Sequence, residues 1–486
     1  MTRTVLTDDR EDFQRLGHRM IDQLAEFLNG VDAGPVDVPV PDDQRRKLST
    51  LTLPEDGQPA GEIIDFISRE VAPYRLCIAH RRSYGWINSP PSPVGILANT
   101  AANAINSGLD GFDHGAMFLM VSLGNWLMEL SGFPNGPDSM AILFSGGSAA
   151  NLNALTAARD RAARADGWNV RKEGLQGNRP RIIVYAADQA HSSIQRCCEQ
   201  MGLGADSLHV IETGDDFRMD PQALAQRIAR DKAAGLRPFC VVAAAGTTNV
   251  GAIDPLDEIA DICEGEGLWF HVDGAYGGLG RLDPHYTQKY LGIARADSLT
   301  VDPHKWMQVP IDCGALLTRH KLAHRDAYAI DPDYLPSDKD DHAPWPYEYM
   351  YQLTYGDRAL KTWATIARLG RKGLGDLIAR CNRTAEAMGT LVEQSYTLEL
   401  LAPVSLSVVN FRFVPRGRCL SETELDHLNE RISDAVLASG EAQVPTTKVR
   451  GRTGMRACIV HHENDAADAE HLVRLVERLG DELAAA

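Results

Sequence analysis

Short apolar runs alternate with longer amphipathic stretches through the middle of the chain. Apolar runs of this length, bounded by turn-forming residues, are typical of buried strands. The predicted strands are 140–145, 181–186, 207–211, 239–245, 268–273, 297–301 and 312–318. Because strands that alternate with helices form parallel sheets with crossover helices, the pattern predicts an α/β domain with a mostly parallel seven-stranded sheet.

The N-terminal part has a different pattern, in which apolar side chains recur at helical spacing. An amphipathic helix is predicted at 11–31, a loop rich in Pro and Asp at 31–60, and further helices at 93–107 and 116–131. The apolar face of the first helix consists of Phe13, Leu16, Met20, Leu24 and Phe27. An arm of this kind cannot build a core alone, so its apolar face packs either on its own domain or on another subunit.

The pattern changes again near residue 371. Helices are predicted at 373–395, 422–438 and 466–482, and strands at 397–402, 406–413 and 455–460. These elements indicate a smaller C-terminal α/β domain. We therefore predict three parts: an N-terminal helical arm with a pocket-wall segment at 1–110, a large ligand-binding domain at 111–370, and the small domain at 371–486.

Composition narrows the functional class. The 486 residues are too many for one ordinary core, and the net charge of −17 argues against nucleic acid or an anionic membrane as a partner. The nine cysteines form no C-x-x-C pair, and neither a signal peptide nor an apolar run of membrane-spanning length is present. We therefore expect a cytoplasmic protein with reduced thiols. His461 and His462 are adjacent in a predicted strand and should face opposite sides, so no metal site is expected.

Lys305 lies between two predicted buried strands, in the stretch Ser298-Leu-Thr-Val-Asp-Pro-His-Lys-Trp. Desolvation favours a neutral amine, and the neutral amine is the form that attacks an aldehyde to make a Schiff base. A single loop lysine is more often simply solvated. The interpretation of Lys305 as a functional amine therefore depends on residues upstream.

Two upstream features support it. Asp273 ends an apolar strand, where its carboxylate would point into the ligand crevice of an α/β sheet and could pair with the protonated ring nitrogen of pyridoxal phosphate. Gly147, Ser148 and Ala149 open an Ala-rich helix directly after the first strand. Free amides at a helix start bind phosphate, although many helices begin with such a turn without binding anything.

The motifs His-Val-Asp-x-Ala-Tyr (271–276) and Asp-Pro-His-Lys-Trp (302–306) resemble the group II pyridoxal-phosphate-dependent decarboxylases, the family of aromatic-amino-acid, histidine and glutamate decarboxylases. The resemblance covers the chain from about residue 10 to the C-terminus. It implies an aspartate-aminotransferase-type fold (fold type I), pyridoxal 5'-phosphate on Lys305, an amino acid substrate, and a homodimer with its active site at the interface.

The resemblance also implies roles for further coenzyme contacts. His191, which by itself could be a helix-cap neighbour, matches the histidine that stacks on the coenzyme ring and can contact the substrate carboxylate. Thr248 matches a position near the coenzyme. Asp302 stands where animal aromatic-amino-acid decarboxylases have a phosphate-contacting Asn, and His304 is a candidate for orienting the phosphate or the lysine.

Substrate contacts are implied in two other segments. Trp86 and Ser89 match positions that contact substrate, in a Pro-rich loop that could equally be a structural turn. The segment 328–355 corresponds to a lid, and Tyr347, with Tyr349 as the alternative, would be its proton donor. Asp113 and the adjacent His114 depart from the pattern of the aromatic-amino-acid enzymes.

The resulting functional prediction is decarboxylation of an L-amino acid, of aromatic type, to the amine and carbon dioxide. Two alternatives remain. One is a reaction with oxygen that converts the same substrate to an aldehyde, and the other is decarboxylation of a polar or cationic amino acid, which Asp113 and His114 would suit. An aminotransferase, a carbon–carbon lyase and a non-catalytic homologue are further readings, because one fold hosts many reactions.

Overall fold

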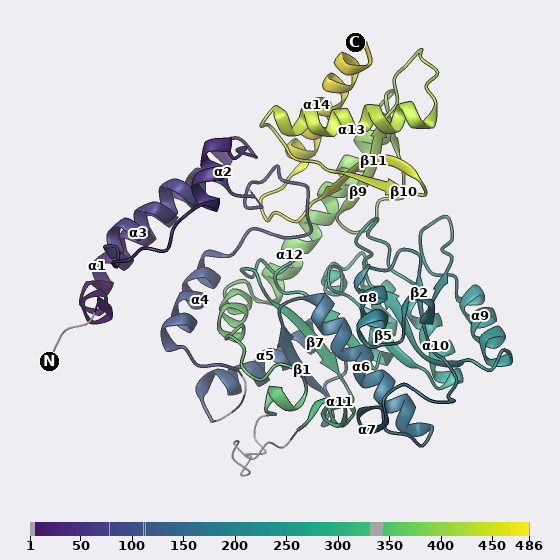
Figure 1. The fold of residues 1–486 in the computed structure, drawn as a ribbon. Coiled ribbons are helices and arrows are strands. Elements are labelled where there is room, and N and C mark those ends of the chain that lie inside the picture. Colours follow the sequence, from purple (N-terminus) through teal and green to yellow (C-terminus); the bar gives the residue numbers. More distant parts are fainter. Residues whose placement is uncertain (1–4, 77, 110, 112, 331–343, 486) are drawn as a thin grey trace.

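The computed structural model describes residues 5–485 apart from residues 77, 110, 112 and 331–343. Its large sheet has seven strands in the order β1-β7-β6-β5-β4-β2-β3 (Figure 1). The strands are β1 Met140–Phe144, β2 Ile182–Ala187, β3 Leu208–Ile211, β4 Arg237–Ala244, β5 Trp269–Asp273, β6 Ser298–Val301 and β7 Gly314–Thr318. Among these strands β7 is antiparallel to both of its neighbours, and the pairs from β6 to β3 are all parallel. The predicted sheet is confirmed strand by strand.

Helices connect and cover these strands. α6 (Gly147–Ala165) begins directly after β1 and packs against five strands, from β1 across to β4. The others in this domain are α4 Pro93–Ile105, α5 Gly115–Ser131, α7 Val170–Glu173, α8 Ser193–Gln200, α9 Pro221–Ala233, α10 Leu256–Glu266 and α11 Lys321–Tyr328. The position of α6 matters for function, because its N-terminus reaches the edge of the sheet where ligands bind in α/β folds.

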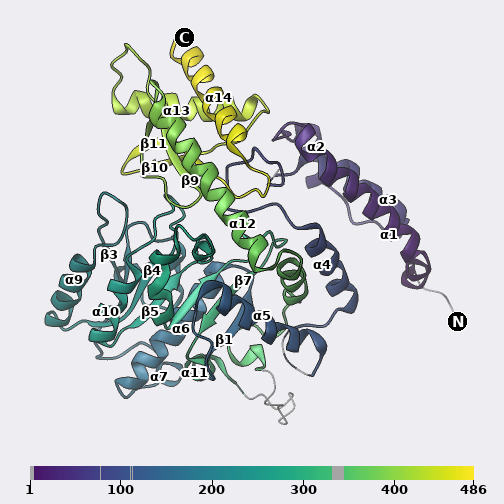
Figure 2. The same cartoon turned by 180° about the vertical axis from the view of Figure 1, so that it is seen from behind.

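The C-terminal part has its own four-stranded antiparallel sheet, in the order β10-β11-β9-β8. Its elements are β8 Leu398–Leu400, β9 Val408–Phe413, β10 Thr446–Val449, β11 Arg452–Cys458, α13 Glu422–Ala438 and α14 Ala466–Ala485. The long helix α12 (Ala359–Gln394) runs between the two sheets (Figure 2). It is interrupted at Gly370, where φ is +65°, next to the predicted domain boundary. β10 was not predicted, because its sequence Thr-Thr-Lys-Val is mostly polar.

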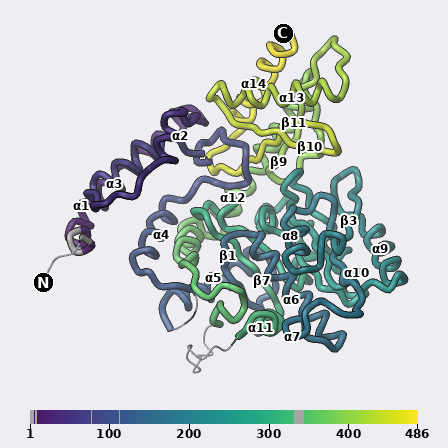
Figure 3. The backbone as a smooth tube through the Cα atoms, in the orientation of Figure 1, coloured from purple at the N-terminus to yellow at the C-terminus, as the bar shows by residue number. Residues whose placement is uncertain are grey.

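The N-terminal arm consists of α1 (Val5–Gly30), α2 (Asp42–Ser49) and α3 (Ala60–Phe66), and it stands apart from the large domain in both views (Figures 1 and 2). The backbone trace shows the chain returning from the arm past the C-terminal domain before α4 (Figure 3). The prediction that 31–60 is all loop is wrong, since Asp42 and Asp43 occupy the first turn of α2. Acidic residues are favoured there by the helix dipole.

Buried side chains of both sheets belong to one continuous apolar cluster. The eight cysteines in the described part of the chain are free, and all but Cys419 are buried. None of the helices described here has an apolar stretch long enough to cross a membrane.

Candidate active site

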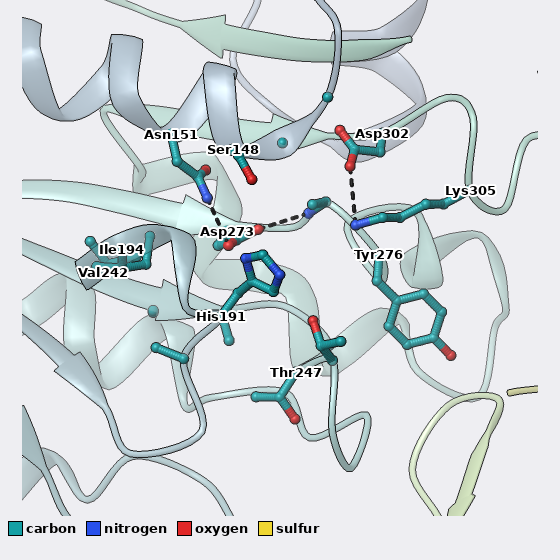
Figure 4. A pocket seen from close by; sticks show the side chains of 18 of the residues that line it. Ser148, Asn151, His191, Ile194, Val242, Thr247, Asp273, Tyr276, Asp302 and Lys305 are labelled. Carbon is teal, nitrogen blue, oxygen red and sulfur yellow. Dashed lines mark hydrogen bonds and ion pairs between the residues drawn. The ribbon is translucent and has the colours of Figure 1, made fainter. Parts of the chain in front are cut away.

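A cavity of about 410 Å³ lies at the carboxyl ends of β2, β4, β5 and β6, the edge at which parallel sheets bind ligands. It is lined by every residue that the sequence assigned to the coenzyme, namely Gly147, Ser148, His191, Thr248, Asp273, Asp302, His304 and Lys305. Figure 4 shows the central side chains. The fold therefore brings together groups from five separate segments of the chain.

Lys305 lies in the turn after β6 and extends toward Asp302 (Figure 4). Its Nζ is 3.0 Å from Asp302 Oδ2, and the Asp302 side chain is almost fully buried. The backbone N–H of Lys305 donates to the carbonyl of Asp302, so a tight turn brings the two side chains together. The sequence predicted a lysine in apolar surroundings, whereas the structure pairs the amine with a carboxylate.

The start of α6 forms an anion-binding cradle. Amides in the first turn of a helix have no carbonyl partner within the helix and attract negative charge. A Cβ atom added to Gly147 would lie 2.9 Å from Ala275 Cβ and 3.1 Å from Asp302 Oδ2. Because a side chain would fill this space, glycine keeps the approach to the free amides open. The cradle fits a phosphate group.

Asp273 ends β5, and both of its carboxylate oxygens accept hydrogen bonds. Asn151 Nδ2 donates to Oδ2 over 2.9 Å, and the backbone N–H of Ala275 donates to Oδ1 over 3.1 Å. A carboxylate held in this way at the cavity can pair with a protonated ring nitrogen.

His191 lies beside Asp273 in the cavity (Figure 4). Its Nδ1 accepts the backbone N–H of Ser193 over 3.2 Å and lies 2.9 Å from Ser193 Oγ. These contacts hold the ring by one nitrogen, so that the other nitrogen is available to a ligand.

His304 directly precedes Lys305 in the same turn and lines the cavity. Its Nδ1 accepts the backbone N–H of Cys313 over 3.0 Å, and its Nε2 is 3.7 Å from Asp302 Oδ2. Burial lowers the pKa of His304, with the Asp302 charge acting in the opposite direction. His304 Nε2 therefore faces the carboxylate that pairs with Lys305.

Of the predicted substrate contacts, His191 lines this cavity, whereas Trp86, Ser89 and the predicted proton donor Tyr347 do not. Trp86 is 46% exposed, and the buried Ser89 donates its hydroxyl to the carbonyl of Lys305. Tyr347 lies in a 3-10 turn, Pro346–Glu348, with its ring packed edge-on against Trp345 at 6.0 Å. These predictions came from motif position, which says nothing about the direction of a side chain. Within one chain, the structure places all three residues outside the cavity lining.

His461 and His462 do not face opposite sides, as the sequence suggested. They follow the end of β11, and their rings stack with centroids 4.6 Å apart. Together with Glu463 they could present three ligand atoms within 4.8 Å. However, His461 Nδ1 accepts the backbone N–H of Glu463, and its Nε2 lies 3.1 Å from the carbonyl of Ala79. Both nitrogens are thus engaged, and burial lowers the pKa of His461 to about 4.

Sequence reasoning missed Asn151, Ser193, His271 and Ser298, which lie around Asp273 and His191. A signal was present for two of them. His271 precedes Asp273 by two residues and therefore shares its face of β5. Asn151 follows Gly147 by four residues and therefore lies one turn along the same face of α6.

The anion cradle, the ring-pairing carboxylate and the lysine amine fit pyridoxal 5'-phosphate. With the seven-stranded sheet and the smaller C-terminal sheet, they define a pyridoxal-phosphate-dependent enzyme of fold type I.

Comparison with known proteins identifies the family. The model of the pyridoxal-dependent decarboxylase conserved domain matches residues 41–414. The aromatic-L-amino-acid decarboxylase of Bacillus atrophaeus is 29% identical over 97% of this chain and 96% of its own. The L-2,4-diaminobutyrate decarboxylase of Acinetobacter baumannii is 31% identical over 77% and 75%. The crystal structure of Oryza sativa TDC with PLP and tryptamine superposes with a TM-score of 0.91 at 25% identity, covering 99% of this chain and 100% of that one.

The chain belongs to the pyridoxal-dependent decarboxylase family and is a pyridoxal-phosphate-dependent amino acid carboxy-lyase.

Proposed function

We propose that this enzyme removes the α-carboxyl group of an aromatic L-amino acid as carbon dioxide and releases the amine. The observation that carries the proposal is the meeting of Lys305, Asp273 and the start of α6 in one cavity. The aromatic substrate is supported by the likeness, over nearly the whole chain, to a protein named aromatic-L-amino-acid decarboxylase.

Each group has a distinct task in this proposal. Bound pyridoxal phosphate supplies the electron sink for the pair released when the carboxylate leaves. Lys305 would provide the amine to which the coenzyme is attached through its aldehyde group. The start of α6, with Gly147 and Ser148, would bind the phosphate. Asp273 keeps the ring nitrogen protonated, which favours the transition state as negative charge develops. His191 would lie against the coenzyme ring, and Thr248 would border it.

A cationic amino acid is the second candidate, because the diaminobutyrate decarboxylase is similar over most of this chain. A positively charged side chain would need a carboxylate beyond those used for the coenzyme. Asp113, an exposed residue shortly before α5, was the sequence candidate, and it is not among the residues that line the cavity of its own chain.

The test is to incubate the coenzyme-loaded enzyme in air with a pool of L-amino acids, including 2,4-diaminobutyrate, and to follow all products by mass spectrometry. An amine from an aromatic acid supports the proposal. An amine from diaminobutyrate or another polar amino acid would show that the proposed aromatic substrate is wrong. An aldehyde with peroxide would show that the proposed reaction is wrong. The heat-inactivated enzyme is the control.

We also propose that the enzyme works as a homodimer whose active site is completed at the interface. The arm presents unusually exposed apolar side chains, including Leu6 at 78% and Phe13 at 65%. The arm projects away from the rest of its own chain (Figures 1 and 2). A second subunit that covered this face would bury these side chains, with about 25 cal/mol gained per Å² of apolar surface.

A further inference from the structure

A chain of hydrogen bonds extends from Asp273 into the interior of the large domain. Asn151 Oδ1 lies 3.0 Å from His271 Nε2, and His271 Nδ1 lies 2.8 Å from Ser298 Oγ. Ser298 Oγ in turn accepts the indole N–H of Trp269 over 2.8 Å. Asn151, His271 and Ser298 are essentially inaccessible to solvent. Polar groups buried this deeply are costly unless each has its partner.

The donor and the acceptor of each hydrogen bond in this series follow from the groups at its two ends. Asn151 must present its NH₂ group to the Asp273 carboxylate, because the opposite orientation would place two oxygens together. Its Oδ1 then faces His271, so His271 carries its proton on Nε2. Burial lowers the pKa of His271 to about 4, with the Asp273 charge opposing the shift, and the ring is neutral. His271 Nδ1 therefore accepts the Ser298 hydroxyl, which is free to donate because Ser298 accepts from Trp269.

The second hydrogen of the Asn151 amide reaches a second part of the site. Asn151 Nδ2 donates to Ser193 Oγ over 3.2 Å, which leaves the Ser193 hydroxyl to donate to His191 Nδ1. The backbone N–H of Ser193 donates to the same nitrogen. Since His191 Nδ1 accepts these bonds, a neutral His191 carries its proton on Nε2, the nitrogen left to the ligand.

We propose that Asn151 and His271 are positioning residues for the reaction. Asn151 links the two groups that flank the coenzyme ring: it holds the Asp273 carboxylate toward the ring nitrogen, and through Ser193 it fixes His191 as an Nε2–H donor. His271 keeps Asn151 in the required orientation. The inference rests on the proposed pairing of Asp273 with the coenzyme and adds the two residues that make this pairing rigid.

The test uses variants that differ in one hydrogen bond. Asn151→Ala removes the link. Asn153→Ala is its matched control, because Asn153 lies on the same helix with similar burial but donates to the carbonyl of Tyr349 and contacts His324. His271→Gln places an amide N–H where the imidazole Nε2–H lies, whereas His271→Asn is too short to reach Asn151.

Each variant is measured in three ways: the dissociation constant of pyridoxal phosphate, the position and pH dependence of the absorption band of the bound coenzyme, and kcat separately from KM. Asn151→Ala and His271→Asn should weaken coenzyme binding and lower kcat by roughly tenfold to a hundredfold, the usual effect of losing an orienting partner, with a shifted absorption band. His271→Gln should recover most of this loss, and Asn153→Ala should resemble the wild type.

The inference is overturned if Asn151→Ala and His271→Asn both keep the wild-type absorption band and coenzyme affinity while Asp273→Asn loses them. It is also overturned if His271→Gln is as impaired as His271→Asn. If Asp273→Asn itself behaves like the wild type, the proposed role of Asp273 fails first, and the positioning role falls with it. Should Asn151→Ala not fold, the two His271 variants decide the question alone.

Discussion

Lys305 Nζ lies 3.0 Å from Asp302 Oδ2, and the same oxygen would be 3.1 Å from a Cβ atom on Gly147, at the start of α6. Asp302 therefore borders both the Lys305 amine and the start of α6, which we propose to bind the coenzyme phosphate. Its other oxygen, Oδ1, is buried without a hydrogen-bond partner among the described residues. A carboxylate next to a phosphate site opposes the charge of the phosphate.

We therefore predict that Asp302→Asn binds pyridoxal phosphate more tightly than the wild type, by about threefold to tenfold, because one repulsive charge is removed. The gain should grow between pH 5.5 and 7.5, since a phosphate monoester loses its second proton with a pKa of about 6. Equilibrium titration of the coenzyme-free enzyme measures the effect. Pyridoxal, which lacks the phosphate, is the control and should show no gain. An equal gain in affinity for both ligands would instead show that the effect comes from loss of the Asp302–Lys305 ion pair.

Lys305→Ala should abolish formation of the amine product, because the side-chain amine to which the coenzyme is attached is lost. The protein should remain folded, because the surrounding turn is unchanged. After borohydride reduction of the loaded enzyme, intact-mass spectrometry should find the coenzyme attached to the wild type and not to the variant. Lys289→Ala is the control, since Lys289 packs on the Tyr286 ring away from the cavity and should leave attachment unchanged. Substantial amine formation by Lys305→Ala would refute the assignment.

The exposed face of α1 leads to a prediction about assembly. Phe13→Glu should shift the protein from dimer to monomer and reduce amine formation in parallel, because it places a charge in the apolar contact. Analytical ultracentrifugation over a concentration series measures the equilibrium. Leu291→Glu, at an exposed apolar residue of the large domain, is the matched control, with 56% exposure against 65% for Phe13. A Phe13→Glu protein that stays dimeric at all concentrations would exclude α1 from the interface.

The sequence predicted the large sheet well because its strands are short apolar runs separated by helices, a pattern in which local signal and tertiary structure agree. Asp273 and Gly147 were found for the same reason, since Asp273 is the last residue of β5 and Gly147 begins α6 shortly after β1. His271 was missed because an imidazole inside an apolar strand looks like a core residue until its partner on α6 is known. The hydrogen bond between His271 and Asn151 joins residues 120 positions apart, which local periodicity cannot show.

Position in a motif was least informative about which residue donates the proton. A donor must touch the reacting carbon, and Tyr347 is 9% exposed, packed on Trp345 and outside the cavity lining. Tyr276 lines the cavity, but its hydroxyl lies 2.6 Å from Ser407 Oγ. Residues 331–343 of the predicted lid segment lie outside the described residues.

In the proposed homodimer Tyr347 would act in the cavity of the second subunit, and we expect Tyr347→Phe to lower kcat by about a hundredfold or more, as is usual for loss of a general acid, with little change in coenzyme affinity. Tyr349→Phe, at the alternative residue, should stay within about threefold of the wild type. Single-turnover assays should separate carbon dioxide release from amine formation, since loss of the donor delays the second step and spares the first. If Tyr349→Phe shows that delay and Tyr347→Phe does not, the donor is Tyr349.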